Sequence, residues 1–291
     1  MQRATRTRTS RPDQPALAVK GRMTVFVRRG SALGARTFTR DTPLPLPKPL
    51  EPGCDYGVIV NGRDLAVERL DCAPDKRHVA GFHFAPGGNA TARAGGDSEP
   101  AINPCSLWDV NFRPSCPDPR GMALVQTPTH KFWCDIYLLG VDHVRDGTSK
   151  LEVTIADGDD PPADPAGRHF SRFDYETAVA VFKHHGKGLL SLDEFFAAAF
   201  GVTEKTATGR DPKITRLDAP RTSRFGLMQA TGNMWVWGHD GDPDLPRASV
   251  FGGAWRSGDD AGSRCADVVG WPENSVGDLG ARGRCDHLQL G

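Results

Sequence analysis

Cysteine and histidine are the residues of this chain whose side chains could bind a metal or act as nucleophiles, so their spacing decides which chemistry is open. The seven cysteines are an odd number without Cys-x-x-Cys spacing, which argues against a usual zinc site and gives no clean disulfide framework. His184 and His185 are adjacent, so on a helix they point about 100° apart and cannot share one metal ion as an i, i+4 pair could. We expect no metal centre built on these residues.

Two His–Asp pairs could support acid–base chemistry, but neither has a suitable nucleophile beside it in the sequence. His239-Asp240 and Asp286-His287 are isolated, with no serine or cysteine in a recognisable nucleophile elbow. We expect Asp286 and His287 to close a terminal strand. The chain is therefore predicted not to be an enzyme.

Carboxylates are dense in residues 156–167, ADGDDPPADPAG, and could indicate a calcium loop. Their spacing does not match the EF-hand pattern, and no glutamate stands at the closing position. We interpret the segment as an acidic, proline-rich linker between two domains. We expect no cofactor, although a structural calcium ion stays open.

Short strands and loops are the elements that must position these residues. Glycine (33) and proline (23) are frequent, which favours a loop-rich fold. Residues 151–155 alternate apolar and polar side chains, the period-two pattern of a half-buried strand. Similar β-like runs cover residues 56–60, 79–84, 122–126 and 132–141.

Two helices are predicted further along the chain. Tyr175, Val179 and Phe182 recur at helical spacing, which indicates a short amphipathic helix. In the second helix Ser191 can act as the N-cap with Glu194 three residues on, the pattern of a capping box.

Charge and hydropathy exclude several classes of partner. Lys+Arg (36) and Asp+Glu (36) balance, which argues against binding to nucleic acid or to an anionic membrane. No apolar stretch approaches the roughly 20 residues that span a bilayer, so no membrane insertion is expected. Residues 1–20 carry arginines without an apolar core and are predicted to be a disordered basic arm, not a secretory signal. A cytoplasmic or virion location with reduced thiols follows.

The last forty residues combine a glycine- and tryptophan-rich frame with small or polar positions that share no pattern. The frame consists of Gly252-Gly253, Trp255, Gly262-Ser263-Arg264, Trp271, Gly280-Ala281-Arg282-Gly283 and Asp286-His287-Leu288. The positions between them are Arg256, Ser257, Asp259, Asp260, Asp267, Val268, Val269, Gly270, Ser275, Val276, Gly277 and Asp278. Such a division suits a binding surface that must change without unfolding its support.

This segment closely resembles the C-terminal variable region of diversity-generating retroelement target proteins, which have a C-type-lectin fold of the formylglycine-generating-enzyme type. GNMWVWGHD, residues 232–240, resembles the GNVWEW motif of that fold family, with Trp235 and Trp237 alternating on a strand. The resemblance implies that the twelve intervening positions bind a ligand. It implies a supporting role for Trp235, Trp237, Trp255, Trp271, Arg264 and Arg282.

The genetic code offers a check on that resemblance. Diversified codons in these systems read NNC, which cannot encode Trp, Met, Lys, Gln or Glu. None of the twelve positions carries a forbidden residue, whereas Trp255, Trp271 and Glu273 lie between them. The sequence is consistent with diversification of these positions.

An oxidase of the formylglycine-generating type is the main alternative. Its copper chemistry needs two thiolates five residues apart; Cys265 matches the downstream one, but Asp260 occupies the upstream position. An invariant structural virion protein is the second alternative, and it would keep the same loop residues in every isolate.

The sequence thus predicts an α+β protein with a mostly β domain over residues 21–160 and a C-type-lectin-like domain over residues 168–291. The latter presents a hypervariable surface to a macromolecular receptor, a protein or glycan on a cell surface, in a phage or a cellular context. Trimeric display is implied by the resemblance alone.

Overall fold

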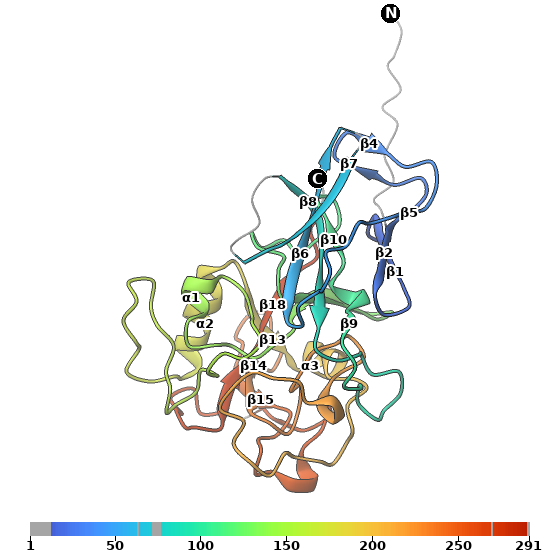
Figure 1. Ribbon diagram of the computed structural model, residues 1–291. Helices are drawn as coiled ribbons and strands as arrows, with labels where there is room; N and C mark the ends of the chain where they lie inside the picture. The colour runs from blue at the N-terminus through green and yellow to red at the C-terminus, as the bar shows by residue number, and fades with distance from the viewer. Residues whose placement is uncertain (1–12, 63, 72–76, 269, 290–291) are drawn as a thin grey trace, which may run out of the picture.

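Two sheets contain most of the strands in the computed structural model, which describes residues 13–62, 64–71, 77–268 and 270–289 (Figure 1). The first has five strands in the order β10-β8-β6-β7, with β9 also paired to β8. Its strands are β6 (Cys54–Asn61), β7 (Asp64–Arg69), β8 (His78–Ala85), β9 (Ala101–Ile102) and β10 (Trp108–Asp109). It covers the predicted runs at 56–60 and 79–84.

Smaller strands precede the first sheet along the chain. β1 (Leu17–Lys20), β2 (Thr24–Val27) and β5 (Thr42–Pro43) form a three-stranded antiparallel sheet, while β3 (Ala32–Leu33) pairs with β4 (Arg36–Thr37). The predicted disordered arm was therefore wrong for residues 17–20. Leu17 and Ala18 are buried in β1, and this apolar run overrides the polar composition around it. Residues 1–12 of that prediction lie outside the described residues.

The second sheet has eight strands, in the order β11-β12-β18-β13-β14-β15-β16, with β17 also paired to β14. The strands are β11 (Met122–Gln126), β12 (Lys131–Asp135), β13 (Gly188–Ser191), β14 (Trp235–His239), β15 (Ala248–Phe251), β16 (Ala266–Asp267), β17 (Leu279–Ala281) and β18 (Gly283–Asp286). β18 lies inside this sheet, between β12 and β13, and extends toward the first sheet (Figure 1).

The second sheet crosses the domain boundary that the sequence predicted at residues 160–168. β11 and β12 precede that boundary, yet β12 pairs antiparallel with β18, with Trp133 opposite Cys285. The segment 156–167 is also not a free linker, because Ala156 and Asp157 are buried. The Asp157 side chain accepts hydrogen bonds from the N–H groups of Asp159 and Asp160, each at 2.8 Å, so it fixes a packed loop.

Helices are few in the part of the chain that the structure describes, so the fold is mostly β with a small helical component. They are α1 (His143–Asp146), α2 (Tyr175–His184) and α3 (Leu192–Ala198), with 3-10 turns η1 (Pro104–Ser106), η2 (Ala219–Arg221) and η3 (Gly258–Asp260). The predicted helix at Tyr175 is confirmed as α2. The capping box of Ser191 and Glu194 is confirmed at the start of α3. None of these helices is long and apolar enough to cross a bilayer.

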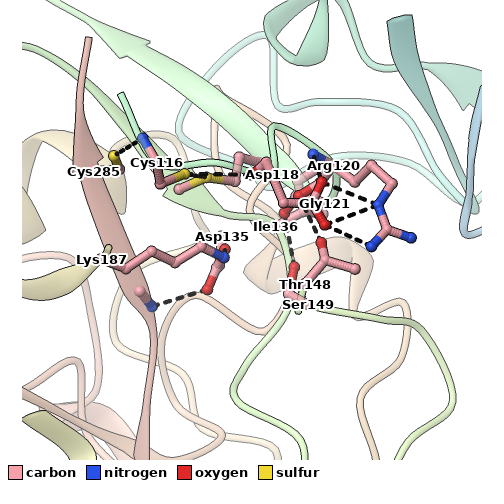
Figure 2. Close-up of polar contacts among 12 residues, drawn as sticks. Cys116, Asp118, Arg120, Gly121, Asp135, Ile136, Thr148, Ser149, Lys187 and Cys285 are labelled. Carbon is pink, nitrogen blue, oxygen red and sulfur yellow. Dashed lines mark hydrogen bonds and ion pairs between the residues drawn. The ribbon is translucent and has the colours of Figure 1, made fainter. Parts of the chain in front are cut away.

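Buried polar groups hold the centre of the second sheet. Lys187 donates to Asp135 at 2.6 Å, and both side chains are fully buried (Figure 2). The backbone N–H of Gly283 donates to the same carboxylate at 3.2 Å. A Cβ at Gly283 would lie 2.5 Å from the Asp135 carboxylate, so only glycine fits there. This network ties β12, β13 and β18 together.

Candidate functional site

The segment between β15 and β17 forms loops on the rim of the second sheet. In Figure 1 the short helical turn η3 lies at the bottom of the molecule, opposite the N-terminal strands. The exposed members of the twelve predicted positions in these loops are Arg256, Asp259, Asp260, Asp267, Val268 and Val276. These side chains offer charges of both signs and two aliphatic groups to solvent.

The other predicted positions are less accessible. Ser257 and Ser275 are half-buried, and their hydroxyls accept hydrogen bonds from Ala254 N–H (3.0 Å) and Phe173 N–H (2.8 Å). Gly270 and Gly277 are half-buried as well. Val269 lies outside the described residues.

Asp278 differs from the exposed members of the twelve predicted positions. It is only 5% exposed, and its carboxylate forms an ion pair with exposed Arg256 at 2.7 Å. Its backbone carbonyl accepts a hydrogen bond from Trp235 N–H at 2.9 Å. Asp278 therefore links the loops to β14, and Arg256 is the member of this pair that a ligand can reach.

The predicted supporting tryptophans differ in burial. Trp237 is fully buried in β14, with its ring edge-on to Tyr175 at 5.9 Å between centroids. Trp235 is half-buried against the same cluster, and half-buried Trp255 packs on the neighbouring core. These three side chains therefore pack in or against the core from which the loops extend.

Trp271 was predicted to support the loops, but its side chain does not pack in the interior. Its side chain is 67% exposed, beside Val268 (40%) and Val276 (46%) in the same loop. The backbone after it is fixed, because the carbonyl of Pro272 accepts a hydrogen bond from Tyr175 N–H at 3.0 Å. A bulky aromatic ring is thus held out into solvent by an anchored loop.

The two predicted supporting arginines have separate surroundings. Arg282 is buried and donates to the carbonyls of Asp135 (2.7 Å), Ile136 (2.6 Å) and Met228 (2.6 Å). Burial lowers the pKa of this guanidinium. Arg264 is exposed instead, with its guanidinium carbon 4.8 Å from the centre of the Phe196 ring. Arg282 therefore stabilises irregular backbone, whereas Arg264 covers an aromatic side chain.

Glu204 is an anchor that the sequence analysis missed. Its carboxylate accepts hydrogen bonds from the Ser263 N–H (2.8 Å) and hydroxyl (2.5 Å). A Cβ at Gly262 would lie 2.4 Å from the same carboxylate, which explains the glycine in the Gly-Ser-Arg frame. No local signal marks Glu204, because its partner is 59 residues away in the sequence.

The residues singled out for metal or catalytic potential have structural surroundings in the part of the chain that the structure describes. Among the described residues, no group of three or more His, Cys, Asp or Glu side chains is placed to hold a metal ion. Burial, then Asp260 and Asp267, raises the pKa of the Cys265 thiol, which opposes a copper-binding thiolate. His287 is buried and accepts a hydrogen bond from the Trp133 indole N–H at 3.0 Å.

Known proteins place this arrangement in a family. No protein-family model matches the chain. The chain is 40% identical over 295 residues to the tail fiber receptor-binding protein of Bordetella phage BPP-1, covering 87% of this chain and 76% of that protein. The solved structures of the U1, I1 and M1 variants of Major Tropism Determinant match it with a TM-score of 0.85 and 37% identity, over 95% of this chain and 84% of theirs.

The identity and the coverage together extend well beyond the C-terminal loops into the first sheet. The chain belongs to the family of phage tropism determinants, the retroelement-diversified variable proteins with a C-type lectin fold.

Proposed function

We propose that this protein binds a receptor on a cell surface from a phage tail fibre, and that the loops between β15 and β17 make the contact. The observation that carries the proposal is the 40% identity to a tail fiber receptor-binding protein, combined with the exposed, patternless residues of these loops. The location that follows is the virion.

The loop surface suits a protein or glycan receptor. Small polar residues adapt their hydrogen bonding to different partners, while a rigid aromatic supplies contact area at low entropic cost. Arg256, Asp259 and Asp260 provide the first kind of group, and Trp271 provides the second. We therefore assign Trp271 to the contact surface.

Oligomeric display strengthens such a surface. One loop set is small, and small interfaces give weak single-site affinity. Linking several sites raises the overall affinity without new contacts. We propose a homotrimer, the state implied by the family resemblance, and its mass by light scattering in solution tests this directly.

The protein needs no bound metal under this proposal. The Lys213 ammonium lies 3.0 Å from Asp211, 3.7 Å from Asp159 and 3.9 Å from Asp157. A positive charge thus already stands among the carboxylates that raised the question of calcium. Treatment with a chelator is expected to leave the thermal unfolding midpoint unchanged.

Deep sequencing of the 3′ end of the gene from a phage population, with its flanking DNA, tests diversified binding. We expect substitutions at the NNC-compatible positions and an adenine-rich repeat nearby that ends in the same frame. A uniform 3′ end without such a repeat would overturn diversification. Invariant Asp259, Asp260 and Val268 in every isolate would then favour a structural virion protein.

A further inference from the structure

The loop after β10 pairs with the end of β18 in an antiparallel register. The Ser115 N–H donates to the Asp286 carbonyl at 2.8 Å, and the Leu288 N–H donates to the Arg113 carbonyl at 2.9 Å. Two segments that are far apart in the sequence therefore continue the second sheet as a short ladder. The register of this ladder decides which side chains face each other.

Two cysteines lie close to this ladder, one on each segment. Pro114 faces His287 between the two hydrogen bonds, as a pair that exchanges none itself, which suits a residue without an N–H. Cys116 comes two residues after Pro114 and Cys285 two residues before His287, so an extension of the same register would bring these two residues opposite each other. Such a pair has Cα atoms about 4.5 Å apart, within the roughly 4.4–6.8 Å that a disulfide spans.

The contacts of the two thiols agree with this register. The Cys116 N–H donates to the Cys285 Sγ at 3.0 Å (Figure 2), and the Ser115 hydroxyl lies 3.1 Å from the same sulfur. Both cysteines are 2% exposed and belong to one apolar cluster with Met122 and Trp133. The Cys116 Sγ donates to the Asp118 carbonyl at 3.3 Å and lies 3.6 Å from the Met122 Sδ, so a disulfide requires this side chain to turn from those groups to the Cys285 Sγ.

The two thiols are also unequal in acidity. The neighbouring Cys116 thiol, followed by the Ser115 hydroxyl, lowers the pKa of the Cys285 thiol to about 6. The proximity of Cys285, together with burial, raises the pKa of the Cys116 thiol. Cys285 is therefore the more acidic thiol and the one expected to attack first.

We propose that Cys116 and Cys285 form a disulfide when the protein meets an oxidising environment. With a small-molecule disulfide such as oxidised glutathione, the Cys285 thiolate attacks one sulfur and releases one glutathione thiolate. The Cys116 thiol then loses its proton to that thiolate or to solvent, attacks the Cys285 sulfur and releases the second glutathione. Two protein thiols become one disulfide, and one glutathione disulfide becomes two thiols.

The bond would join two parts of the chain that are 169 residues apart. A cross-link between distant residues restricts the unfolded chain more than the folded one, so it stabilises the fold. It would fasten β18, which ends the variable segment, to the loop after the first sheet.

Thiol counting on the full chain tests the proposal. The protein is refolded with oxidised and reduced glutathione, treated with a maleimide reagent in denaturant, digested and analysed by mass spectrometry. We expect two of the seven thiols to be lost, a linked peptide containing Cys116 and Cys285, and a thermal midpoint that falls on reduction. Seven reactive thiols, or a cross-link between other cysteines, would overturn the proposal.

Single variants sharpen the assignment once the unmodified protein has been measured. Cys116→Ala and Cys285→Ala are each expected to abolish the cross-link and the response of the midpoint to reductant. Cys105→Ser is the matched control, because half-buried Cys105 lies outside the ladder, and this variant should keep both. Persistence of the cross-link in Cys116→Ala would contradict the pairing, whether or not the variant reaches full stability.

Discussion

Two arginines near β17 show how the frame differs from the loops: Arg282 follows this strand directly, and Arg256 pairs with Asp278, the residue before it. Arg282 is buried and donates to three backbone carbonyls, whereas the Arg256 side chain is 64% exposed and forms one ion pair, with Asp278. Replacing Arg282 removes hydrogen-bond donors from buried carbonyl groups. Replacing Arg256 changes mainly the chemistry of the exposed surface. The larger structural demand therefore falls on buried frame residues such as Arg282, and exposed loop side chains such as Arg256 carry less of it.

Arg282→Met breaks this division most severely. The carbonyls of Asp135, Ile136 and Met228 would lose a donor, although the Ile136 carbonyl keeps the hydrogen bond from the Met228 N–H at 2.9 Å. Each buried group left unsatisfied costs about 1–3 kcal/mol. We expect the free energy of unfolding in urea to fall by roughly 4 kcal/mol or more. Arg247→Met, at a side chain that is 73% exposed, should change it by less than about 0.5 kcal/mol. Equal losses in the two variants would show that burial does not separate these arginines.

Tryptophan offers the same comparison within one residue type. Trp237→Ala removes a fully buried ring, and the free energy of unfolding should fall by roughly 3–5 kcal/mol. Trp271→Ala should change it by less than about 0.5 kcal/mol, because that ring is mostly exposed, yet should weaken receptor binding about tenfold or more. Denaturation and surface plasmon resonance measure the two effects. Loss of stability in Trp271→Ala without loss of binding would return this residue to the frame.

The pH dependence of stability reports on the frame through His287. Burial, then Lys131, lowers its pKa from 6.5 to about 4. Above pH 6.5 the His287 ring is neutral in the folded and in the unfolded protein. Between pH 6.5 and 4 the ring is protonated in the unfolded protein and neutral in the folded protein. Stability therefore falls as pH decreases through this window.

Denaturation at a series of pH values tests this effect. His287→Gln should make the slope of the unfolding free energy shallower by about one proton over that range. Parallel slopes in His287→Gln and the unmodified protein would exclude His287 as the source.

Combined loop changes should have the smallest effect on stability. The variant Asp259→Ser, Asp260→Ser, Val276→Ser alters three exposed side chains at once. Its thermal midpoint should stay within a few degrees of the unmodified protein, because exposed substitutions rarely cost more than about 0.5 kcal/mol each. A large drop in calorimetry would show that the loops carry part of the stability.

Local patterns were readable from the sequence where neighbouring residues alone determine the structure. Ser191 and Glu194 cap α3 through contacts only three residues apart, so the motif is sufficient. The alternation of Leu151, Val153 and Ile155 misled, because Glu152 adopts a left-handed backbone with φ of 58°. That region forms isolated bridges, such as Thr154 to Ile214, in place of a strand.

The remaining errors concern long-range contacts. Composition cannot distinguish a flexible linker from the loop that Asp157 fixes, since both are rich in Asp, Pro and Gly. It also cannot tell exposed Trp271 from buried Trp237. The candidate surface could be located from the sequence because its frame residues all lie within the last forty residues. Glu204 and the β12–β18 pairing join segments that are distant in the sequence, so they leave no local pattern.

The internal position of β18 makes folding depend on complete translation of the loop segment that precedes it. This strand follows the loops in the chain, yet β12 and β13 can join into one sheet only through it. A stop codon or frameshift within the loops would remove β17 and β18 and leave the sheet open. Only chains that are translated in frame through the loops can complete the fold. Truncated variants are therefore removed by misfolding before they can bind a receptor.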